Sequence, residues 1–119
     1  MKLLSRWFRR SDVAPSWIEA TVLARHLEQN GALLILDVRG PDAFSGPLGH
    51  IEGAINLPLA ELPDRAPDLV RDDRPVVVVC KTDRRSSIAA RQLREVGPSD
   101  VSVLRGGMEQ WRGLGLPVS

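Results

Sequence analysis

One cysteine lies where its neighbours could make it a nucleophile. Cys80 follows the apolar run 75–79 (PVVVV) and is the one cysteine in the sequence. A short polar loop comes next, and a helix is predicted to begin near Ser86. In an open α/β sheet, ligands bind at the carboxyl ends of the strands. We therefore expect Cys80 to lie at a binding edge of such a sheet.

The loop after Cys80 predicts an anion-binding site around the sulfur. Unpaired N–H groups at a helix N-terminus, together with the helix dipole, favour an anion. The same field favours the thiolate, which is the nucleophilic form of cysteine. Lys81, Arg84 and Arg85 add three cations within five residues of the sulfur. The alternative is an inert buried thiol, as free cysteines often are, and the basic loop argues against it.

The overall composition narrows the class of protein. The chain has 119 residues, 43% hydrophobic and 26% charged, which fits one ordinary soluble domain. The formal net charge is +1, so the chain as a whole lacks the basic surplus of a nucleic-acid-binding protein. A single cysteine excludes an internal disulfide and a zinc site built from cysteines. It suits a reducing compartment, and we expect the cytoplasm.

The N-terminal segment differs from the rest of the sequence. Residues 1–10 place apolar residues at helical spacing with basic residues between them. The apolar residues are Leu3, Leu4, Trp7 and Phe8, and the basic ones are Lys2, Arg6, Arg9 and Arg10. We interpret 1–14 as a basic amphipathic segment and linker, and 15–118 as the folded domain. A short helix that packs on the domain is expected, with weak contact to a membrane surface as the alternative. No run approaches the ~20 apolar residues of a membrane span, and no signal peptide is recognised.

Alternating patterns predict an α/β domain that would position Cys80. Segments with helical spacing are 19–29, 59–70 and 86–96, the second interrupted by Pro63 and Pro67. Strand-like apolar runs are 32–38, 75–80 and 101–104, with a brief strand expected near 54–56. Continuous apolar runs of this kind are typical of parallel strands buried on both faces. A last helical turn begins at Gly106–Gly107, and 11–16 is interpreted as a linker. The predicted class is α/β with a mainly parallel sheet.

Three parts of the sequence together resemble the rhodanese homology domain. They are 36–39 (LDVR) with 49–58 (GHIEGAINLP), 80–86 (CKTDRRS), and 104–111 (LRGGMEQW) with 115–118 (GLPV). They resemble the first signature, the active-site loop and the C-terminal signature of that family, in the same order. The match covers about residues 15–118. It implies a rhodanese-like three-layer domain, with a central sheet flanked by helices on both faces.

The resemblance also implies a sulfurtransferase. Cys80 would take a sulfane sulfur from thiosulfate or a persulfide donor, hold it as a persulfide, and pass it to cyanide or a thiol. The substrate-binding loop would comprise Lys81, Thr82, Asp83, Arg84, Arg85 and Ser86. No metal and no organic cofactor are implied. The expected partners are a small-molecule sulfur donor, a thiol or cyanide acceptor, and a sulfur-relay protein.

Two other functions stay open. The first is a rhodanese-type module that binds an anion or a partner without turnover. The second is a phosphatase or arsenate reductase, because phosphatases of a related fold use a similar loop to surround phosphate. Their loop is one residue longer, whereas Arg85 is the fifth residue after Cys80. The loop length therefore favours sulfur chemistry.

Asp83 departs from the family pattern, in which glycine is common at this loop position. Glycine suggests a positive φ, which Asp tolerates better than most residues. We therefore expect a left-handed backbone at Asp83. A carboxylate near the mouth of the site would also oppose an anionic donor, unless Arg84 or Arg85 neutralises it.

The remaining polar and aromatic candidates have mainly structural interpretations. Asp37 and Arg39 end the strand 32–38, at the same sheet edge as Cys80, and are expected to form a supporting ion pair. His50 is expected to bond within its loop rather than act as a base. Met108 and Trp111 are expected in the core. In the helix 86–96, the face expected to be buried comprises Ile88, Ala89, Leu93 and Val96.

Overall fold

The computed structural model describes residues 16–29 and 31–119. Its elements are β1 (Ser16–Ile18), α2 (Ala20–Glu28), β2 (Leu34–Asp37), α3 (Pro41–Phe44), β3 (Ile55–Asn56), η2 (Leu59–Glu61), α4 (Leu62–Leu69), β4 (Val76–Val79), α5 (Arg84–Val96), β5 (Val101–Leu104) and α6 (Gly107–Gly113). The basic segment 1–14 lies outside the described residues, and with it the expected short helix and the alternative of weak membrane contact. None of the described helices has the length and apolar character of a membrane span.

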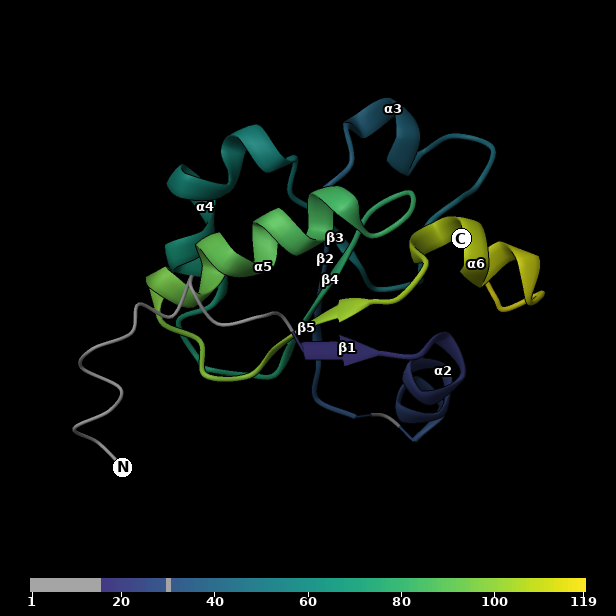
Figure 1. Cartoon of the computed structure of the whole chain (residues 1–119), viewed down its shortest axis with the longest axis horizontal. Coiled ribbons are helices and arrows are strands. Elements are labelled where there is room, and N and C mark those ends of the chain that lie inside the picture. Colours follow the sequence, from purple (N-terminus) through teal and green to yellow (C-terminus); the bar gives the residue numbers. More distant parts are fainter. Residues whose placement is uncertain (1–15, 30) are drawn as a thin grey trace.

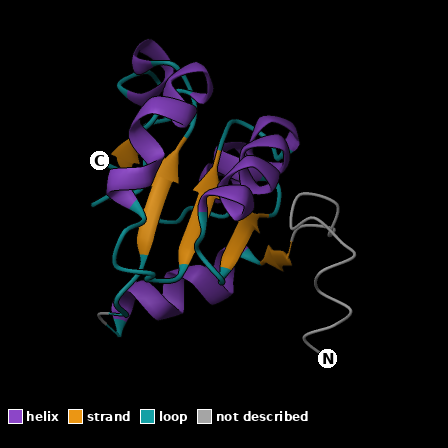
Figure 2. Ribbon diagram, turned by 90° about the vertical axis from the view of Figure 1, so that its left-hand side faces the viewer, coloured by secondary structure: helices purple, strands orange, loops and turns teal. Residues whose placement is uncertain are grey.

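The five strands form one parallel sheet in the order β1-β5-β4-β2-β3. Strand β4 lies between β5 and β2, with Val78 in register with Val103 on one side and Leu36 on the other. The arrowheads of the longest strands point the same way in Figure 2. The carboxyl ends of β2 and β4 therefore meet at one edge of the sheet, which is where ligands bind in such folds.

Alternation along the strands divides the core into two halves. Val76 and Val78 pack with α4 and α5 on one face, whereas Val77 and Val79 pack with α2 and α6 on the other. Successive strand side chains point to opposite faces, so Cys80 continues the α4 and α5 side. Figure 1 shows α4 and α5 on one side of the strands and α2 on the other. The three-layer α/β architecture expected from the sequence is confirmed.

The structure corrects three local expectations. Ser16, expected to end a linker, begins β1, whose register with β5 runs from Ser16–Ser102 to Ile18–Leu104. Pro63 and Pro67 do not interrupt α4. Pro63 lies in the first turn, where its missing N–H is not needed. On α5 the buried apolar face is Ala89, Ala90 and Leu93, while Ile88 and Val96 are 50% and 38% exposed.

Candidate active site

Cys80 immediately follows β4 and is 2% exposed. Its Sγ lies 3.2 Å from Ser86 Oγ, and the backbone N–H of Ser86 donates to Sγ at 3.3 Å. Ser86 is fully buried in the first turn of α5. The start of α5 therefore places the N–H and the hydroxyl of Ser86 within hydrogen-bond distance of this sulfur.

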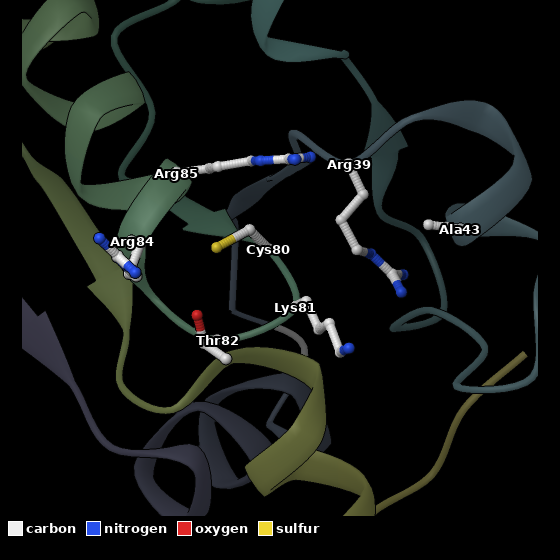
Figure 3. A pocket seen from close by; sticks show the side chains of 7 residues that line it. All are labelled: Arg39, Ala43, Cys80, Lys81, Thr82, Arg84 and Arg85. Atoms are coloured by element: carbon white, nitrogen blue, oxygen red, sulfur yellow. The ribbon is translucent and has the colours of Figure 1, made fainter.

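A pocket of about 280 Å³ opens beside the sulfur (Figure 3). Its lining comes from the loop between β4 and α5, from the end of β2 and from α3, and comprises Arg39, Ala43, Cys80, Lys81, Thr82, Arg84 and Arg85. In Figure 3 the hydroxyl of Thr82 points toward the sulfur, and Arg85 extends toward the segment that carries Arg39. Four of the seven lining side chains are cationic, which favours an anionic ligand.

The loop cations are available to a ligand. Lys81, Arg84 and Arg85 are exposed. Lys81 Nζ lies 4.0 Å from a Glu109 carboxylate oxygen, at the limit of an ion pair. No carboxylate among residues 16–29 and 31–119 lies within ion-pair distance of Arg84 or Arg85. Their charge is thus free to act on an incoming anion.

Asp37 and Arg39 form the expected ion pair, and both are almost fully buried. Arg39 Nη2 lies 2.7 Å from Asp37 Oδ2, and its Nε donates to Asp37 Oδ1 at 2.9 Å. Nη2 also donates to the carbonyl of Gly49 at 2.7 Å, which anchors the loop after α3. Arg39 therefore supports the pocket wall, with its charge largely balanced by Asp37.

The N-terminal end of α6 packs against the active-site loop and donates hydrogen bonds to it. The N–H of Met108 donates to the carbonyl of Cys80 and that of Glu109 to the carbonyl of Lys81, both at 2.9 Å. Gly107, at φ +58°, packs directly on the loop, because a Cβ there would collide with the carbonyl of Thr82. The chain described contains no cis peptide bond. In a trans peptide the N–H points opposite to the C=O, so the N–H groups of Lys81 and Thr82 point away from α6.

The backbone conformation of Asp83 differs from the one expected from the sequence. Its φ is −148° and its ψ is 11°, so the expected left-handed backbone is wrong. The residue instead ends the loop as the N-cap of α5, with its carbonyl accepting the N–H of Ser87 at 3.1 Å. Its carboxylate accepts the N–H of Gly106 at 3.0 Å and is absent from the pocket lining. The turn that brings Cys80 to α5 therefore does not need positive φ at this position.

His50, Met108 and Trp111 have the structural roles expected from the sequence. His50 Nδ1 lies 2.8 Å from the carbonyl of Phe44, and its ring stacks on the Phe44 ring at 3.7 Å between centroids. Met108 and Trp111 are buried in the core between the sheet, α2 and α6. The Trp111 indole N–H donates to the carbonyl of Pro117 at 2.8 Å. None of these three side chains lines the pocket beside Cys80.

Two parts of the site were not expected from the sequence. Ala43 lines the pocket from α3, a helix too short to show a periodic pattern. The contact of Gly107 with the active-site loop was also missed. The sequence feature that could have indicated this contact is the adjacent pair Gly106–Gly107, because glycine adopts positive φ readily. Both residues do have positive φ in the structure. Within the described residues, no three His, Cys, Asp or Glu side chains are grouped as metal ligands.

Comparison with known proteins points to one family. The family model described as "Rhodanese-like domain" matches residues 19–114. The solution structure of the rhodanese-like domain of the Alr3790 protein from Anabaena superposes with a TM-score of 0.77 at 36% identity, covering 85% of this chain and 76% of that one.

Curated relatives include proteins with and without a stated activity. The uncharacterized protein YqhL of Bacillus subtilis is 42% identical over 79 residues, which is 66% of this chain and 60% of that protein. The thiosulfate sulfurtransferase GlpE of Pseudomonas aeruginosa is 40% identical over 93 residues, covering 76% and 79%. This chain spans only 48–60% of the length of YqhL and two further relatives.

Proposed function

Because this chain belongs to the rhodanese-like family, we propose that it is a sulfurtransferase that works through a persulfide on Cys80. The donor is thiosulfate or another sulfane-sulfur compound, and the acceptor is cyanide or a thiol. The similarity to GlpE, whose name states thiosulfate sulfurtransferase activity, supports this choice. The observation that carries the proposal is the buried sulfur of Cys80, which accepts a hydrogen bond from Ser86 and opens to a pocket lined by the exposed cations Lys81, Arg84 and Arg85.

In the first step the Cys80 thiolate attacks the outer sulfur of thiosulfate. A bond forms between Sγ and that sulfur, and the sulfur–sulfur bond of thiosulfate breaks. The electron pair of the broken bond leaves with sulfite. Charge balances, because a thiolate and a dianion become a persulfide anion and a sulfite dianion. The exposed Lys81, Arg84 and Arg85 offset the repulsion between the two anions.

The persulfide then needs stabilisation until an acceptor arrives. The N–H groups of Lys81 and Thr82 point away from α6, so they are free to donate to the terminal sulfur. Preorganised donors of this kind stabilise developing negative charge without reorganisation. In the second step the acceptor attacks the terminal sulfur, and the Sγ–sulfur bond breaks. Cyanide leaves as thiocyanate, or a thiolate leaves as a new persulfide, and the Cys80 thiolate is restored.

Mass spectrometry of the intact protein tests the proposal. After incubation with thiosulfate, the protein should gain one sulfur atom, and cyanide should remove it. Cys80→Ser should gain none. If thiosulfate binds but no sulfur is transferred in the wild-type protein, the loop is an anion-binding module rather than a catalytic site.

The cellular setting is part of the same proposal. Cys80 is the one cysteine of the sequence, and it must be a thiol before each turnover. A reducing compartment such as the cytoplasm would maintain that state. A sulfur-relay protein with a nucleophilic thiol could act as acceptor in place of cyanide, because the second step needs only a thiolate that reaches the pocket.

A further inference from the structure

Asp83 connects the active-site loop to a segment far away in the sequence. Its carboxylate Oδ2 accepts the N–H of Gly106 at 3.0 Å, across a sequence separation of 23 residues. Gly106 is the N-cap of α6 and has φ +76°. Hydrogen bonds to a charged acceptor are stronger than neutral ones, and this one is partly buried. The contact is therefore suited to hold the loop on α6.

The other hydrogen bonds between this loop and α6 do not depend on a side chain. Met108 and Glu109 donate their N–H groups to the backbone carbonyls of Cys80 and Lys81. These two bonds hold the first half of the loop. Asp83 is placed to hold the second half, between Thr82 and Arg84, which both line the pocket.

From this geometry we propose that Asp83 is a positioning residue for the sulfur donor. By bonding to Gly106, it fixes the turn between Thr82 and α5 in the shape that presents loop N–H groups to an anion. This role rests on the proposed sulfurtransferase function. The carboxylate is directed to Gly106 and does not line the pocket, so it acts through a hydrogen bond rather than through repulsion of the donor.

Two substitutions separate the hydrogen bond from the charge. Asp83→Asn keeps an oxygen that can accept the N–H of Gly106 and removes the charge, whereas Asp83→Ala removes both. We expect Asp83→Ala to lower kcat/KM for thiosulfate about fivefold, which corresponds to about 1 kcal/mol, the usual net value of one hydrogen bond. Asp83→Asn should stay within about twofold of the wild type. Asp68→Ala, on the exposed surface of α4, is the control for the loss of one negative charge.

The second half-reaction distinguishes positioning from a general loss of folded protein. In a two-step transfer, kcat/KM for each substrate reports its own half-reaction. A loosened loop should lower kcat/KM for thiosulfate by more than kcat/KM for cyanide, because cyanide attacks a sulfur that is already bonded to Cys80. Partial unfolding of Asp83→Ala would lower both by the same factor, and that result would overturn the positioning role.

A readout without sulfur transfer keeps this inference separate from the proposed function. Cys80 is the one cysteine of the chain, so alkylation reports on it alone. We expect Asp83→Ala to lower the rate ratio of anionic iodoacetate to neutral iodoacetamide, and Asp83→Asn to preserve it. If the wild type transfers no sulfur, the proposed function fails, and this ratio still decides the role of Asp83. An unchanged ratio in Asp83→Ala, or an equal fall in both variants, would overturn it.

Discussion

The backbone N–H of Met108 donates to the carbonyl of Cys80 at 2.9 Å, which joins the end of β4 directly to α6. This bond fixes the orientation of the peptide that follows the cysteine. Because a trans peptide is planar, it also directs the N–H of Lys81 away from α6. The C-terminal helix thus decides which backbone groups of the active-site loop are free to meet an anion.

Replacement of Cys80 by serine should abolish sulfur transfer and preserve the fold. A hydroxyl is far less nucleophilic than a thiolate, whereas it can still accept the N–H of Ser86. The unfolding free energy should change by about 1 kcal/mol or less. Thiocyanate formation and denaturant unfolding measure the two effects. Turnover of the serine variant at the wild-type rate would show that Cys80 is not the nucleophile.

Arg85→Ala should weaken the use of thiosulfate more than it lowers stability. The side chain is exposed, lines the pocket and has no carboxylate partner among the described residues. Loss of its attraction for a dianion should lower kcat/KM about fivefold to thirtyfold, equivalent to about 1–2 kcal/mol. The difference should shrink at high ionic strength, because salt screens exposed charges.

Arg91→Ala is the matched control for that prediction. Arg91 is exposed on the same helix but does not line the pocket, and its loss changes the net charge equally. Its kinetics should match those of the wild type. If Arg85→Ala behaves like Arg91→Ala, backbone groups alone bind the donor.

Gly107→Ala should both destabilise the protein and impair the site. A Cβ at this position would collide with the carbonyl oxygens of Cys80, Lys81 and Thr82, and φ is +58°. Positive φ and overpacking together should cost about 2–4 kcal/mol. Thermal unfolding and thiosulfate kinetics, measured where the variant is still folded, test both effects.

Gly113→Ala provides the comparison within the same helix. A Cβ at Gly113 would meet no atom within 4 Å, and its φ is not positive. Stability should stay the same or rise slightly, because alanine has the higher helix propensity. Equal destabilisation by the two substitutions would contradict the close packing of α6 on the loop.

Asp37→Asn should destabilise the fold strongly. The change leaves the buried charge of Arg39 without its carboxylate partner, and breaking a buried ion pair in this way typically costs about 3–5 kcal/mol. Denaturant unfolding measures the loss. By contrast, Glu61→Gln breaks an exposed pair with Arg65 and should cost about 1 kcal/mol or less. Similar losses of unfolding free energy in the two variants would show that the buried Asp37–Arg39 pair stabilises the fold no more than an exposed pair does.

The sequence alone determined the elements around Cys80. The apolar run before it predicted β4, the basic residues after it predicted an anion site, and the three signatures predicted the family. These features depend on neighbouring residues, because strand composition, helix caps and loop charge are local properties. The ion pair of Asp37 with Arg39 could also be predicted from the sequence, since only two positions separate these residues.

Only the tertiary structure decided contacts between segments that are distant in the sequence. Ser16–Ile18 is too short to show a strand pattern and is ordered by pairing with β5. Asp83 was expected to have positive φ because glycine is common there in the family, yet its conformation is set by α5 and its carboxylate by Gly106. Gly107 meets the loop only once β4 and β5 lie side by side. Local propensity does not encode which distant backbone group a side chain meets, because the packing of the whole sheet selects that partner.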